Sequence, residues 1–188
     1  MILPISRRRF FGQSVGLTTG ALLTRSLGLK AASLGGGRLA SVGTTPMIIT
    51  SHPNSTGQAA LEEVWEALAA GGSALDAVEK ATNVIELDPD DMSVGYGGLP
   101  NEDGVVQLDA SIMDGRTYNA GAVAGIENIK HPSSVARLVM ERTDHVMLAA
   151  EGAKEFARSF GFPEVDLMTP KSRRAWLRWR EEHSDRDD

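Results

Sequence analysis

The chain has 188 residues, of which 41% are apolar and 23% charged, and its net charge at pH 7 is −6. This length suits roughly one domain of an ordinary soluble protein. Cysteine is absent, which excludes disulfides, cysteine zinc sites and thiol catalysis. No apolar run is long enough for a membrane-spanning helix. The acidic charge with few aromatic residues argues against nucleic-acid binding.

Positive charge is concentrated near the N-terminus. Residues 1–61 contain six Lys and Arg and no acidic side chain, so the rest of the chain carries a net charge of −12. The segment SRRRFF (6–11) resembles a twin-arginine export signal, and an apolar, glycine-rich stretch follows it. We predict that residues 1–45 are a signal and linker, and that the protein is periplasmic or secreted by the twin-arginine route. A disordered basic tail is the alternative.

The next residues predict a short strand and two helices. Residues 47–50 form an apolar run typical of a buried strand. Ser55 and Gln58 fit a capping box that opens a helix. The predicted inward face of this helix has helical spacing: Leu61, Val64, Trp65 and Leu68. Ser73 is predicted to cap a second helix that stops at Asp88 and Pro89. Its predicted inward residues are Leu75, Val78 and Ile85.

A hairpin and three further helices complete the predicted fold. Residues 105–113 read as a strand, Asp114-Gly115 as a turn, and residues 117–124 as the returning strand. Helices are predicted to begin at Pro132, Glu151 and Pro170, and residues 181–188 form a charged tail. This order predicts an α/β or α+β domain in which helices pack on a sheet.

Residue types and spacing alone reveal no complete catalytic site. The glycine-rich loop SVGYGG (93–98) fails the G-x-G-x-x-G pattern because position 100 is proline, so its glycines indicate tight turns or close packing. Asp109 is interpreted as a buried structural carboxylate and Asp114 as a turn residue. None of the histidines has metal-ligand spacing, and all are interpreted as surface or capping residues: His52, His131, His145 and His183. The tryptophans are expected to pack in the core or between helices: Trp65, Trp176 and Trp179.

Several ordered motifs nevertheless carry a resemblance to a known family. They are GGSALDAVE (71–79), SVGYGG (93–98), LDASIMDG (108–115) with GAV (121–123), SVARLVM (134–140) and TDHVML (143–148). In this order they resemble the α subunit of glycosylasparaginases, which belong to the isoaspartyl peptidase/asparaginase group of N-terminal-nucleophile hydrolases. The SVGYGG form favours glycosylasparaginase over plant-type asparaginases, whose loop has an Asn-Ala-Gly core.

The resemblance implies a four-layer αββα sandwich, with residues 46–180 as the α-subunit part. It also implies a precursor that cuts itself, so that a β subunit begins with a nucleophilic threonine whose α-amine acts as base. The implied substrate is a small N4-substituted asparagine, cleaved at its side-chain amide without metal or cofactor. Two αβ units are expected to pair.

Two features depart from the family pattern. No His-Asp or His-Gly step followed by threonine precedes Asp188, so the nucleophile is expected beyond this chain, which is predicted to be a truncated precursor, inactive alone. The family's substrate-pocket tryptophan falls near Asn54. Asn54 and Ser93 are thus the predicted substrate-binding residues, although Ser93 also fits a loop-capping role. The alternative functions are isoaspartyl peptidase or L-asparaginase, and a non-catalytic scaffold subunit.

Overall fold

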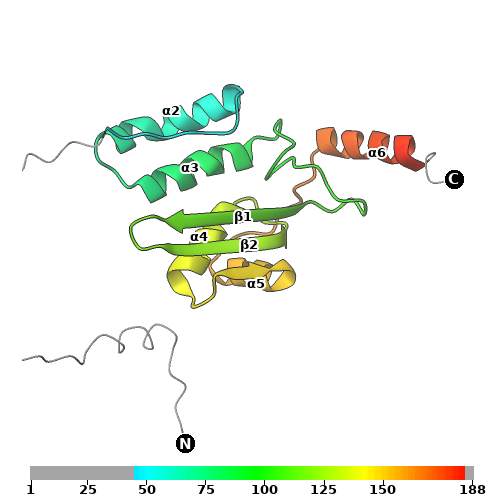
Figure 1. Cartoon of the computed structure of the whole chain (residues 1–188). Helices are drawn as coiled ribbons and strands as arrows, with labels where there is room; N and C mark the ends of the chain where they lie inside the picture. Colours follow the sequence, from blue (N-terminus) through cyan, green and yellow to red (C-terminus); the bar gives the residue numbers. More distant parts are fainter. Residues whose placement is uncertain (1–44, 185–188) are drawn as a thin grey trace, which may run out of the picture. The chain divides into compact units, whose positions relative to one another are not determined.

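The computed structural model describes residues 45–184 (Figure 1). The predicted export signal falls almost wholly outside the described residues, as does the end of the charged tail. Within residues 45–184, no helix is both long and apolar enough to cross a bilayer.

Two helices, α2 (Ser55–Ala69) and α3 (Ala74–Leu87), lie side by side and form one layer (Figure 1). The Asn54 side chain caps α2 by accepting the N–H of Gly57 at 2.9 Å. The predicted cap, Ser55, is instead the first helical residue. Ser73 caps α3 as predicted, accepting the N–H of Asp76. Between the helices Gly71 has φ +90°, a backbone conformation that favours glycine.

Small residues form the contact between α2 and α3. The buried residues of this layer are Ala60, Val64, Leu68, Ala77, Ala81 and Ile85. Two predicted inward residues lie elsewhere, because Trp65 is 46% exposed and Val78 is 42% exposed. The alanines let the two helices approach closely, and this narrow stripe leaves both larger side chains at its edges.

The predicted hairpin is confirmed. β1 (Gln107–Asp114) pairs antiparallel with β2 (Asn119–Glu127), and β3 (Met147–Ala149) runs parallel to β2, in the order β1-β2-β3. Asp114 closes the turn by accepting the N–H of Arg116 at 2.9 Å. The pairing shifts register between Leu108 and Ala110, which marks a β-bulge at Asp109.

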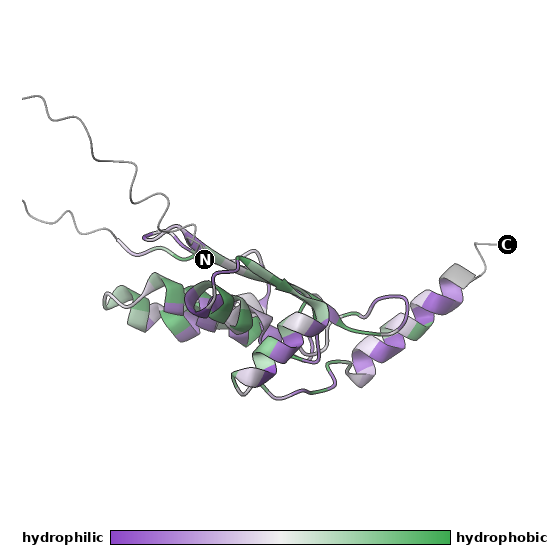
Figure 2. Ribbon diagram, turned by 90° about the horizontal axis from the view of Figure 1, so that it is seen from below, coloured by the Kyte–Doolittle hydropathy of each residue, from purple (hydrophilic) through white to green (hydrophobic). Residues whose placement is uncertain are grey.

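Helices cover one face of this sheet. α4 (Pro132–Arg142) packs on β1 and β2, and α5 (Ala150–Ser159) packs on β2, so that helices gather on one side of the strands (Figure 2). The core between them contains Leu108, Ile112, Val123, Ile126, Val135 and Val139. Along β1, buried and exposed residues alternate, which leaves the opposite face of the strand open. The mixed α/β expectation is confirmed, and within residues 45–184 the sheet has three strands.

Residues 47–50 do not form the predicted buried strand. They are extended but unpaired, with Met47 78% and Ile49 82% exposed. An extended segment becomes a strand only when a neighbouring strand supplies hydrogen bonds, and residues 45–184 supply none to this segment.

The last helix, α6 (Pro170–Ser184), begins at the predicted proline. The Trp176 ring lies against Gly104, and its indole N–H donates to the Glu102 carbonyl at 3.3 Å. Packing is therefore confirmed for Trp176. The prediction that Trp179 is a core residue is wrong, since that side chain is 42% exposed.

Candidate functional site

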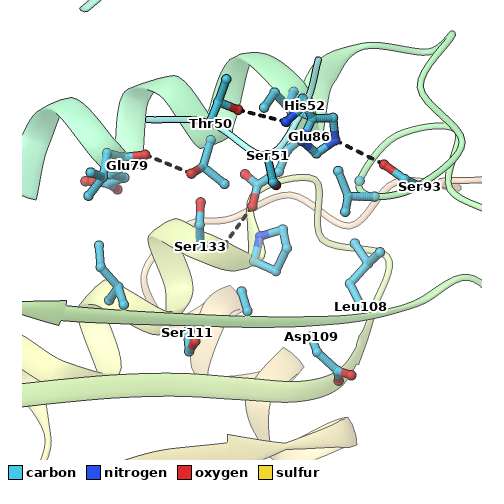
Figure 3. Close-up of a pocket in the computed structure, with 18 of the residues that line it drawn as sticks. Thr50, Ser51, His52, Glu79, Glu86, Ser93, Leu108, Asp109, Ser111 and Ser133 are labelled. Carbon is cyan, nitrogen blue, oxygen red and sulfur yellow. Dashed lines mark hydrogen bonds between the residues drawn. The ribbon is translucent and has the colours of Figure 1, made fainter. Parts of the chain in front are cut away.

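A cavity of about 600 Å³ lies between α3 and β1 (Figure 3). Its walls come from five segments that are far apart in the sequence. They are residues 49–52, the side of α3 that carries Glu79 and Glu86, the loop at 93–95, residues 107–112 of β1, and residues 132–133 at the start of α4. The cavity therefore joins the helical layer to the sheet.

Glycines hold the loop SVGYGG (93–98) tightly against the end of α3. Gly95 has φ +62°, and an added Cβ would lie 2.2 Å from the Glu86 carbonyl oxygen. The neighbouring N–H of Tyr96 donates to that same carbonyl at 2.7 Å. A larger residue at position 95 would push the loop away from the helix. The interpretation of these glycines as close-packing residues is confirmed.

Glu86 is a buried carboxylate that sequence reasoning missed. It is 2% exposed, and its Oε1 accepts the N–H of Ser133 at 3.0 Å. Its Oε2 accepts from Asn83 Nδ2 at 2.9 Å and lies 3.2 Å from His131 Nδ1. His131 occupies the N-cap position of α4 but makes no side-chain cap bond, so Glu86 satisfies this helix end from α3. The sequence held one sign of this buried carboxylate, because Glu86 directly follows Ile85, which was predicted to face inward.

Ser93, Asp91 and His52 form a cluster at the cavity wall. Both the backbone N–H of Ser93, at 2.8 Å, and its hydroxyl donate to Asp91 Oδ1. His52 Nε2 lies 3.2 Å from Ser93 Oγ and 3.4 Å from Asp91 Oδ2. Burial alone would raise the pKa of Asp91, but the hydrogen bonds from Ser93 and the proximity of His52 bring it below its ordinary value. Asp91 is therefore an ionised acceptor in this cluster.

The cluster contains the residue types of a serine hydrolase but not the arrangement. A catalytic triad needs a serine that donates to one imidazole nitrogen and a carboxylate that accepts from the other. Here the same Nε2 faces both partners, and the Ser93 hydroxyl donates to Asp91. This geometry orders Ser93 without activating it as a nucleophile.

In the structure, both predicted substrate residues hydrogen-bond Asp91. Ser93 lines the cavity (Figure 3), whereas Asn54 is exposed and caps α2. Asn54 also hydrogen-bonds Asp91 and contributes to its lowered pKa. Their proposed contact with substrate stays a prediction.

Asp109 differs from its expected environment. It is exposed, and its Oδ1 accepts the N–H of Gly125 at 2.7 Å across the hairpin. The structural hydrogen bond is confirmed and the burial is wrong, because Asp109 lies on the open face of β1 beside the bulge. Asp109 and Asp114 occupy opposite faces, as their spacing predicts. Among the residues that the structure describes, no three His, Cys, Asp or Glu side chains gather as metal ligands would.

Comparison with known proteins places this fold and site in a family. The family model described as Asparaginase matches residues 35–188. The chain therefore belongs to this asparaginase family, and the predicted membership among N-terminal-nucleophile hydrolases is confirmed.

Curated relatives of several kinds are similar to this chain. An N(4)-(beta-N-acetylglucosaminyl)-L-asparaginase from Elizabethkingia miricola is 44% identical over 93% of the chain and 50% of its own length. A plant-type L-asparaginase from Pyrococcus abyssi is 52% identical over 64% of the chain and 41% of its own length. An isoaspartyl peptidase/L-asparaginase from Xenopus laevis is 46% identical over 64% of the chain and 40% of its own length. The chain thus spans about half the length of these relatives, or less.

Proposed function

We propose that this chain is the α part of an amidohydrolase that cleaves the side-chain amide of an N4-substituted asparagine. The observation that carries the proposal is the family match combined with a cavity lined by Ser93 of the SVGYGG loop. The similarity to the Elizabethkingia relative extends over nearly the whole chain, which supports a glycosylasparaginase-like activity.

The proposed chemistry needs a threonine supplied from outside these 188 residues. A free threonine hydroxyl is a weak nucleophile, and self-cleavage would create an α-amine beside it with an ordinary pKa of about 7.7–8.0. Such an amine is partly unprotonated at neutral pH and serves as the base. The partner in this proposal is a β subunit that begins with the threonine, and two αβ units form the assembly.

The contribution of this chain is to shape one side of the active site. Glu86 fixes the start of α4 against α3, and the close-packed Gly95 fixes the loop that carries Ser93. Glu86 lies on α3, and the loop at Gly95 is bonded to the end of α3. Residues supported by regular elements in this way hold a binding site in a precise geometry.

A second candidate function is that of an isoaspartyl peptidase or L-asparaginase. It is favoured by the identities of 52% and 46% to relatives with those names. The two candidates differ in substrate, since one acts on glycosyl-asparagine and the other on β-aspartyl dipeptides or asparagine. A non-catalytic subunit is the outcome if the complete protein turns over none of them.

The test of self-cleavage uses the coding sequence extended beyond Asp188. We expect the purified product to separate into two chains by intact mass, with the smaller chain beginning at a threonine. A variant with that threonine changed to alanine should remain one chain. An uncut wild-type product, or a cut in front of another residue, would contradict the proposed mechanism.

We also propose that residues 1–45 direct export by the twin-arginine route. The support is the paired arginine motif and the absence of acidic residues before Glu62. Changing Arg7 and Arg8 together to lysine should retain a fused reporter in the cytoplasm of a bacterial host. Unchanged export of the double variant would contradict this route.

A further inference from the structure

The backbone of Tyr96, in the loop SVGYGG (93–98), is fixed by hydrogen bonds to two distant segments. Its neighbours Gly95 and Gly97 have φ +62° and +105°, so Tyr96 lies outside any regular element. The N–H of Tyr96 donates to the Glu86 carbonyl at 2.7 Å, and the N–H of Gly97 donates to the Leu167 carbonyl at 2.8 Å. These bonds place the backbone, whereas the direction of the Tyr96 ring depends on what the ring contacts.

The Tyr96 ring contacts the connector between β2 and α4, residues 128–131. The ammonium of Lys130 lies 4.3 Å from the centroid of the ring. This distance is well inside the range of about 6 Å over which a cation is attracted to the face of an aromatic ring. Both side chains are half-buried, and the ring also packs against the core of the sheet. Partial exclusion of water strengthens such an attraction.

Lys130 and the adjacent His131 contact two parts of the same junction. His131 Nδ1 lies 3.2 Å from Glu86 Oε2, and the Glu86 carbonyl accepts the N–H of Tyr96. The contacts therefore form a closed set that runs from Lys130 through Tyr96 and Glu86 to His131. This set couples three segments that all line the cavity: the loop, the end of α3 and the start of α4.

We propose that Lys130 is a positioning residue for this part of the cavity wall. Its ammonium holds the Tyr96 ring, and through Tyr96 it fixes the loop relative to the start of α4. Within the described part of the chain Lys130 is not among the residues that line the cavity, so it acts through Tyr96. The placement of the loop rests on contacts within residues 45–184. That the loop faces a substrate rests on the proposed function.

Amide hydrogen exchange of the 188-residue chain measures the placement of the loop. Peptides that cover residues 93–99 report local opening of the loop, and peptides from α4 report opening of the core. The readout is the ratio of the two exchange rates, measured by mass spectrometry on chain kept at sub-micromolar concentration. A general loss of stability accelerates both sets of peptides, so it does not change this ratio in the way that release of the loop alone does.

Substitutions of Lys130 separate its charge from its packing. Lys130→Met keeps an unbranched side chain without the charge, and we expect loop exchange relative to α4 to become about threefold faster, as loss of a cation–π contact implies. Lys130→Arg keeps a cation and should restore the wild-type ratio. Lys80→Met removes the same charge from the exposed side of α3. This matched control should leave the ratio unchanged.

Substitutions of Tyr96 test whether its ring is the partner of Lys130. Tyr96→Phe keeps an aromatic ring and should exchange as the wild type does. Tyr96→Leu should accelerate loop exchange at least about threefold. Adding Lys130→Met to Tyr96→Leu should have no further effect, because the contact that it removes is already absent.

Three results would each overturn the proposal: an unchanged ratio in Lys130→Met, no restoration by Lys130→Arg, or effects of Lys130→Met and Tyr96→Leu that multiply. In the protein extended beyond Asp188, Lys130→Met should raise KM about threefold and change kcat by less than about twofold. A loss confined to kcat would contradict a role in placing the binding wall. Absence of turnover by the unsubstituted extended protein would contradict the proposed function instead, and the exchange result would stand.

Discussion

At the scale of single residues, the site depends on carboxylates whose hydrogen bonds are made inside the protein. Glu86 provides two such oxygens at the junction of α3 and α4, and Asp91 provides two at the cavity wall. Neither Glu86 nor Asp91 belongs to a cluster of metal ligands or to a catalytic triad in the described part of the chain. Each instead holds in place a backbone segment that lines the cavity.

Replacing Glu86 tests the first of these roles. Glu86→Ala leaves the N–H of Ser133 without its buried acceptor and removes one of the hydrogen bonds of the Asn83 amide. We expect it to lower the free energy of unfolding by about 2–3 kcal/mol. Glu86→Gln keeps an acceptor and should cost less. Urea unfolding followed by circular dichroism measures both. Glu63→Ala, on the exposed side of α2, is the control, and an equal effect of this control would contradict the role of Glu86.

At the scale of elements, local signals predicted most boundaries and missed contacts made over long distances in the chain. Ser73 and Asp114 were predictable because a cap and a turn use neighbouring residues. The strand at residues 47–50 was not, because strand formation depends on a partner far away. Glu86 and the cluster of His52 with Ser93 were missed for the same reason, since their partners lie more than forty residues apart.

The junction of β3 with α5 carries a locally unfavourable conformation. Ala150, the first residue of α5, has φ +48°, whereas its neighbour Ala149 has φ −135°. The left-handed region costs an L-residue with a Cβ about 1–2 kcal/mol. We expect Ala150→Gly to raise the free energy of unfolding by about 0.5–1 kcal/mol, after the greater freedom of glycine in the unfolded chain is subtracted.

The matched comparison for this prediction is Ala149→Gly. That backbone is ordinary for alanine, so the same substitution should destabilise the protein there. Thermal unfolding of the two variants beside the wild type decides the matter. A loss of stability in both variants would show that the conformation of Ala150 carries no strain.

At the scale of the whole described region, the sheet is covered by helices on one face only. Gln107, Asp109, Ser111 and Met113 lie on the open side of β1, and the unpaired residues 47–50 present two exposed apolar side chains. The family membership explains this arrangement if a second sheet covers the open face. The four-layer sandwich remains the proposed fold of the complete protein.

This open surface predicts self-association of the chain alone. Exposed apolar side chains on an unpaired extended segment favour edge pairing, so we expect light scattering to show oligomers that grow with concentration in the micromolar range. Changing Met47 and Ile49 together to serine should reduce this association. A wild-type chain that remains monomeric throughout that range would contradict the prediction.

The central claim is that this chain forms one side of an asparagine amidohydrolase whose threonine nucleophile is supplied from elsewhere. The most direct measurement compares hydrolysis of glycosyl-asparagine by the 188-residue chain and by the product of the coding sequence extended beyond Asp188. We predict turnover by the extended product and none by the chain alone. Equal turnover by both, or none by the extended product on glycosyl-asparagine, asparagine and β-aspartyl dipeptides, would contradict it.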